Sequence, residues 1–70
     1  MKLSARNVIK GKVVEVVKGQ TTAHVRLEVA DGTIVTASIT NNAVDDLGLQ
    51  VGQQAYAVIK ASDVMIAVDD

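Results

Sequence analysis

Residues 23–29 alternate strictly between apolar and polar side chains, and this pattern limits what the chain can fold into more than any other feature. A period of two places successive side chains on opposite faces of a strand, so the segment predicts a half-buried β-strand. Asp31-Gly32 follows closely, and this pair favours a tight hairpin because type I′ turns need positive φ. Residues 33–40 are therefore predicted to return as the neighbouring strand.

Three more segments are predicted to be strands. Residues 8–17 are rich in β-branched side chains and are interrupted by Gly11, which predicts a bulge or bend at that position. Residues 55–59 and 64–68 are short apolar runs separated by a polar turn. The chain has no proline, so no strand is barred from the centre of a sheet.

One short helix is predicted after the third strand. Thr40 or the following Asn can cap its start, and Gly48 can adopt the left-handed conformation that ends a helix. No linker, repeat or low-complexity tract interrupts the chain. The expected architecture is all-β: a single domain, residues 1–70, folded as a five-stranded OB-like Greek-key barrel with one short helix.

A chain of this length has little interior. A domain of this size buries only about 60% of its unfolded surface, so its stability as a monomer is marginal. The chain has no cysteine, which excludes disulfides and thiolate metal sites, and its one histidine, His24, cannot form a metal cage alone. Because 49% of the residues are apolar, we expect the chain to gain stability by forming a homo-oligomer.

Several partner classes are disfavoured. The net charge is −1 and Tyr56 is the one aromatic residue, so the chain lacks both the basic excess and the stacking platform of a nucleic-acid binder. The N-terminus has no apolar signal region, and no apolar run approaches the roughly 20 residues of a membrane helix. The expected location is the cytoplasm, with no membrane partner.

Catalysis is also not expected. His24 occupies a polar position of an alternating strand, which indicates a surface or interface residue. Asp45, Asp46 and Asp63 need not lie together, and a solvated helix face explains the first two. The chain has no nucleophile elbow and no glycine-rich phosphate loop. We therefore predict no enzyme activity, no catalytic residues, no directly ligated metal cation and no organic cofactor.

Two segments concentrate hydrogen-bond donors. Ser4-Ala5-Arg6-Asn7 precedes the first strand, and Lys60-Ala61-Ser62 breaks the apolar run near the C-terminus. Ordinary chain-end and turn chemistry would account for either one. Each nevertheless pairs a cation with a hydroxyl, which suits a small oxyanion whose surface offers only acceptors. Thr40, at the end of the third predicted strand, could add a hydroxyl.

These motifs resemble those of the molbindins, the small molybdate-binding Mop proteins whose unit is a Mop or TOBE-like domain. The likeness covers essentially the whole chain, from Ser4-Ala5-Arg6-Asn7 and Gly11-Lys12-Val13-Val14 to residues 58–65. It implies a hexamer of barrel subunits that hold molybdate or tungstate at their interfaces. Ala43 stands where relatives can have a serine. By this pattern one subunit contributes Ser4, Ala5, Arg6 and Asn7, and another contributes Thr40, Lys60, Ala61 and Ser62.

The resemblance also implies a second class of site near the symmetry axes. The candidate is the turn formed by Gly19, Gln20, Thr21 and Thr22, which offers hydroxyls and amides.

A site of this kind binds a dianion by offsetting its charge with Arg6 and Lys60 and by directing donors at all four oxygens. Without a nearby carboxylate it would exclude protonated anions such as hydrogenphosphate. The expected function is cytoplasmic storage or homeostasis of molybdate or tungstate. The alternative is an OB-like oligomerisation or regulatory module, TOBE-like, with no storage role.

Overall fold

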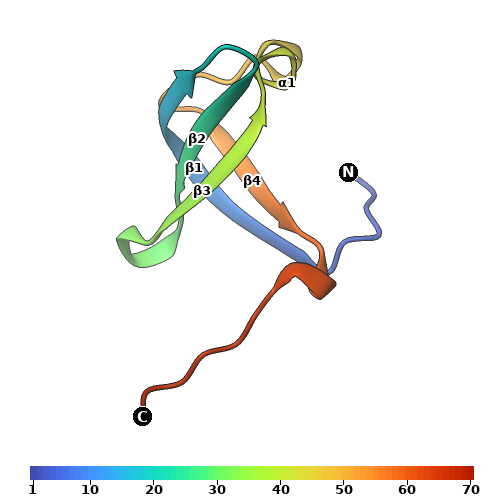
Figure 1. The fold of residues 1–70 in the computed structure, drawn as a ribbon, viewed down its shortest axis with the longest axis vertical. Helices are drawn as coiled ribbons and strands as arrows, with labels where there is room; N and C mark the ends of the chain where they lie inside the picture. The colour runs from blue at the N-terminus through green and yellow to red at the C-terminus, as the bar shows by residue number, and fades with distance from the viewer.

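The computed structural model describes all 70 residues as a curled antiparallel sheet with one short helix (Figure 1). The sheet has the strand order β3-β2-β1-β4, and every neighbouring pair is antiparallel. In chain order the elements are β1 (Asn7–Lys18), β2 (Thr22–Glu28), the 3-10 turn η1 (Ala30–Gly32), β3 (Ile34–Thr40), α1 (Asn41–Leu47), β4 (Gln54–Ile59) and the 3-10 turn η2 (Ala61–Asp63).

The long strand β1 joins the two halves of the sheet. Its first half pairs with β4, from Asn7 opposite Ile59 to Lys12 opposite Gln54, and its second half pairs with β2. The register with β2 shifts between Val13 and Glu15, which is the signature of a β-bulge. Because a bulge bends and twists its strand, β1 can belong to both halves and the sheet curls.

The bulge predicted at Gly11 was placed at the wrong residue. Gly11 is paired regularly with Ala55, and the irregularity follows Val13. Glycine is instead required at position 11 because β2 packs closely against it. A Cβ atom at this position would lie 2.6 Å from the carbonyl oxygen of Glu28 and 2.9 Å from the side chain of Leu27. The strand interior therefore has no room for a side chain here.

The local turn signals are confirmed. Asp31 and Gly32 have φ values of 63° and 76°, as a tight turn between β2 and β3 requires. The side-chain oxygen of Thr40 accepts a hydrogen bond from the Ala43 N–H at 3.0 Å and so caps α1. Gly48 ends the helix in the left-handed region, with φ of 61°.

The hydrophobic core is very small. Only five of the 70 residues are buried, all of them apolar: Val13, Ala23, Val25, Leu27 and Val44. The alternation predicted for β2 is seen directly, because Ala23, Val25 and Leu27 are buried while the residues between them are exposed. Val44 is the one buried residue of α1, and through it the helix covers one end of the sheet. No helix of this protein has the length and apolarity to cross a membrane.

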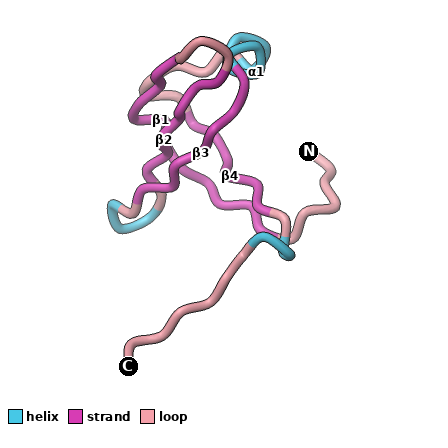
Figure 2. Tube along the Cα trace, in the orientation of Figure 1, coloured by secondary structure: helices cyan, strands magenta, loops and turns pink.

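The fifth predicted strand does not form in the single chain. Residues 64–70 have no regular secondary structure, and they lead away from the sheet beyond η2 (Figures 1 and 2). A strand exists only if it has a strand to pair with, and this segment meets none in its own chain. The fold is therefore mostly β with one helix, as expected, but it has four strands and not the five of the predicted barrel.

Candidate functional site

The two donor segments singled out in the sequence lie together in the structure. The pairing of Asn7 with Ile59 places the start of β1 beside the end of β4. The side-chain amide nitrogen of Asn7 reinforces this pairing by donating to the Ile59 carbonyl oxygen at 3.2 Å. An open pocket of roughly 650 Å³ results, and eight residues line it: Ser4, Ala5, Arg6, Val58, Lys60, Ala61, Ser62 and Asp63.

The donors of this pocket are not used inside the chain. The side chains of Ser4, Arg6, Lys60 and Ser62 take part in no hydrogen bond or ion pair of this structure. The turn η2 fixes the second segment, because the Asp63 N–H donates to the Lys60 carbonyl oxygen at 2.9 Å. The first N–H groups of such a turn have no partner within it, so they add backbone donors. The pocket therefore offers two cations, two hydroxyls and backbone amides.

Asp63 also lines this pocket, which the sequence analysis did not anticipate. The exclusion of protonated anions was tied to a site without a nearby carboxylate, and this pocket wall includes an acidic residue. The available signal was the spacing: Asp63 follows Ser62 directly and closes the same turn that begins after Lys60. One acidic residue thus lines the pocket together with the two cations, and it forms no ion pair with either of them.

Two predicted site residues lie outside the pocket. Asn7 is adjacent to it, but its amide nitrogen is committed to Ile59. Thr40 pairs with Thr22 at the opposite end of the sheet, and its hydroxyl oxygen accepts the cap bond from Ala43. Within one chain Thr40 therefore does not meet Lys60. Ala43 is half-buried beside this cap.

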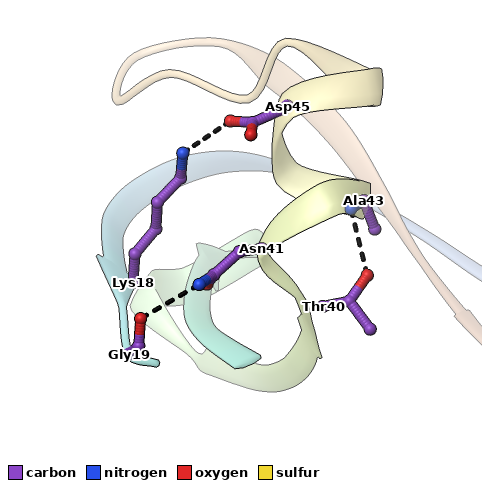
Figure 3. A network of polar contacts seen from close by, with 6 residues as sticks. All are labelled: Lys18, Gly19, Thr40, Asn41, Ala43 and Asp45. Atoms are coloured by element: carbon purple, nitrogen blue, oxygen red, sulfur yellow. Dashed lines mark hydrogen bonds and ion pairs between the residues drawn. The ribbon is translucent and has the colours of Figure 1, made fainter. Parts of the chain in front are cut away.

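The turn predicted as a second anion site packs against α1 (Figure 3). The side-chain amide of Asn41 donates to the Gly19 carbonyl oxygen at 2.9 Å, and its backbone N–H donates to the Thr21 carbonyl oxygen at 2.9 Å. Lys18 forms an ion pair with Asp45 across the same corner. The backbone of the turn is thus held by the chain itself, while the side chains of Gln20, Thr21 and Thr22 are exposed and have no partner in the chain.

The other residues considered for catalysis do not form a cluster. His24 lies on the exposed face of β2, opposite Val17 of β1 and Ser38 of β3. Asp45 is engaged with Lys18, and Asp46 is exposed on α1. No three His, Asp or Glu side chains lie close enough together to hold a metal ion.

Comparison with known proteins assigns this chain to a protein family. The family model of the TOBE domain matches residues 3–66. Molybdenum-pterin-binding protein 3 of Clostridium pasteurianum is 53% identical over 66 residues, which cover 94% of this chain and 97% of that protein.

Solved structures agree. MopII from Clostridium pasteurianum superposes with a TM-score of 0.90 at 46% identity, over 96% of this chain and 100% of that one. The cytoplasmic molybdate-binding protein ModG, in a form with molybdate bound, superposes with a TM-score of 0.89 at 45% identity, over 93% of this chain and 46% of that chain.

Proposed function

The chain belongs to the TOBE domain family and, within it, to the molybdenum-pterin-binding (Mop) proteins, and on this basis we propose that it binds molybdate and tungstate in the cytoplasm for storage or homeostasis. One observation carries the proposal. Two segments more than fifty residues apart bring unpartnered cations and hydroxyls into a single pocket at the joined ends of β1 and β4.

The chemistry of the pocket suits a tetrahedral dianion. An anion that leaves water must recover hydrogen bonds to its four oxygens, and it needs positive charge nearby. Arg6 and Lys60 supply charge-assisted donors, and Ser4 and Ser62 supply hydroxyls. The backbone N–H groups of Ala61 and Ser62, at the start of η2, add donors whose position is fixed by the turn.

We propose that a second copy of the chain completes the site. An isolated chain leaves much apolar surface in water, and the segment beyond η2 is the extreme case. Met65, Ile66 and Val68 are 92%, 87% and 86% exposed. Contact between copies would bury this surface and is strongly favoured. In such a homo-oligomer, a hexamer by the family resemblance, Thr40 of one copy would face the pocket of another.

We also propose that the turn between β1 and β2 forms the second class of oxyanion site. The turn of Gly19, Gln20, Thr21 and Thr22 presents two hydroxyls and one side-chain amide that no group of the chain uses. Copies meeting at this turn would collect several such donors around a symmetry axis. The likeness to ModG, whose structure was solved with molybdate bound, supports an oxyanion as the ligand.

Removal of either pocket cation tests the proposal. A hydrogen bond to a charged group contributes about 1.5–3 kcal/mol, so Arg6→Ala or Lys60→Ala should weaken molybdate binding roughly 10- to 100-fold. Titration calorimetry measures the affinity, and circular dichroism verifies that the fold is retained. The matched control is Lys12→Ala, which removes one exposed cation outside the pocket and should leave the affinity unchanged.

Two outcomes would contradict the proposal. Unchanged molybdate affinity in both pocket variants would remove this pocket from the binding site. If equilibrium dialysis shows no uptake of molybdate, tungstate or sulfate by the unmodified chain, the chain acts as an oligomerisation or regulatory module without a storage role.

A further inference from the structure

The carboxylate of Asp63 is the one acidic group in a pocket whose other charged residues are Arg6 and Lys60. The backbone of Asp63 is held in η2 by the hydrogen bond from its N–H to the Lys60 carbonyl oxygen at 2.9 Å. The Val64 N–H donates to the Ala61 carbonyl oxygen at 3.3 Å and holds the far side of the same turn. Asp63 therefore remains a residue of the pocket wall as long as the turn that supplies Lys60 and Ser62 is folded.

The charge of Asp63 is not cancelled inside the chain. The two ion pairs of the structure join Lys18 to Asp45 and Arg26 to Glu15, and neither involves the pocket. No hydrogen bond to the Asp63 side chain forms within the chain either. Two cations and one carboxylate leave the pocket a net charge of only +1 toward an incoming dianion.

A carboxylate acts on an oxyanion in two ways. Its negative charge repels the anion, and the repulsion is largest for a fully ionised dianion. Its oxygens only accept hydrogen bonds, so an anion oxygen that carries no proton finds no partner there. An oxyanion that still carries a proton, such as hydrogenphosphate, can donate that proton to the carboxylate and recover part of the lost energy.

We infer that Asp63 is a specificity-determining residue of this pocket: its carboxylate limits the affinity for dianions such as molybdate and narrows the preference for them over protonated oxyanions. This inference rests on the proposed function, because it takes the pocket to be the oxyanion site. The dianion is therefore bound less tightly than the two cations and the hydrogen-bond donors alone would bind it. The lower affinity allows the bound anion to exchange with solution.

Removal of this one charge tests the inference. Asp63→Asn keeps the size of the side chain, removes the charge and adds a donor, and no contact within the chain is lost. At about 0.01 M salt, where charges act over roughly 30 Å, we expect molybdate to bind about tenfold more tightly to this variant. The ratio of molybdate to phosphate affinity, measured by titration calorimetry with each anion, should also rise, because hydrogenphosphate is relieved of the same repulsion but loses the acceptor for its proton. Near 1 M salt, where screening acts within about 3 Å, the gain should shrink.

Two control variants separate a local effect from a general one. Asp31→Asn removes the same charge from the exposed β2–β3 turn outside the pocket. At about 0.15 M salt, where charges act over roughly 8 Å, it should change molybdate affinity less than about twofold. Asp63→Glu keeps the charge and should bind molybdate as the unmodified chain does. Unchanged or weaker molybdate binding by Asp63→Asn, or an equal gain in Asp31→Asn, would overturn the inference.

The failure of this inference differs from the failure of the proposed function. If Arg6→Ala loses molybdate binding while Asp63→Asn leaves it unchanged, the pocket is the site and only the role of Asp63 is wrong. If the unmodified chain takes up no molybdate, the proposed function fails and the inference fails with it.

Discussion

The two ends of β1 carry similar polar residues but use them in opposite ways. At the end near Lys18 the polar groups satisfy one another: Lys18 pairs with Asp45, Asn41 binds the β1–β2 turn, and Thr40 caps α1 (Figure 3). The side-chain oxygen of Asn41 is the one buried polar side-chain atom left without a partner. At the end near Asn7 the cations and hydroxyls of the pocket have no partner in the chain.

This difference separates groups that hold the fold from groups that are free to bind. A polar group with a partner inside the chain contributes to stability, and its removal leaves the partner unsatisfied. A polar group that the fold positions but does not use remains available to a ligand or to another copy. We call the two regions the closed end, near Lys18, and the open end, near Asn7. Substitutions of the paired groups at the closed end should change stability, and substitutions of unpaired groups, such as those of the pocket at the open end, should change binding or assembly.

Removal of residues 64–70 should have the largest effect at the open end. This segment belongs to no strand or helix of its own chain, so the sheet should remain. Its exposed apolar side chains are the strongest candidates for contact between copies, so the shortened chain should lose its assembly entirely. Light scattering measures the mass, and circular dichroism measures the strand content. An assembly that keeps its mass without these residues would show that copies meet elsewhere.

Thr40→Ala tests whether Thr40 acts only at the closed end or also contributes to the pocket of a second copy. Loss of the cap bond to Ala43 should lower the free energy of unfolding by about 1 kcal/mol, as for other N-cap residues. If Thr40 also faces the pocket of a second copy, molybdate affinity should fall several-fold as well. Thr40→Ser keeps the cap and the hydroxyl and should restore both properties. Melting at fixed protein concentration and calorimetry measure the two effects. A loss of stability with unchanged affinity would restrict Thr40 to the closed end.

The smallest effect is expected for the ion pair of the closed end. Lys18 and Asp45 have side chains that are 47% and 62% exposed, and exposed pairs contribute about 0.2–1 kcal/mol. A double-mutant cycle of Lys18→Ala and Asp45→Ala should give a coupling energy in this range, with no change in molybdate binding. A large change in affinity from either single variant would mean that this ion pair takes part in ligand binding.

Much of this architecture follows from local sequence signals. The alternation over residues 23–29, the Asp31-Gly32 turn and the caps of α1 depend on neighbouring residues, and each was predicted correctly. The meeting of the segment around Arg6 with that around Lys60 inside one chain was not predicted, because the resemblance to Mop proteins implied that the two segments come from different subunits. What the sequence did not show depends on distant contacts. Gly11 is required by the carbonyl oxygen of Glu28, and the bulge lies elsewhere.

Two other differences between the prediction and the structure also depend on contacts between distant parts of the chain or between copies. Residues 64–68 have the composition of a strand, but a strand needs a partner edge, and the single chain does not bring one to them. Asp63 was interpreted as a turn residue, since only the folded chain shows that it lines the same pocket as two cations. Thr40 lies far along the sheet from Lys60, so its place in a site depends on contact between copies.

Size-exclusion chromatography with light scattering and molybdenum analysis, after incubation with molybdate and excess sulfate, tests most directly whether the open end is an oxyanion site completed by another copy. The account predicts a homo-oligomer that retains molybdenum through the column, and an Arg6→Ala variant that elutes without it. A monomer saturated with molybdate would contradict it.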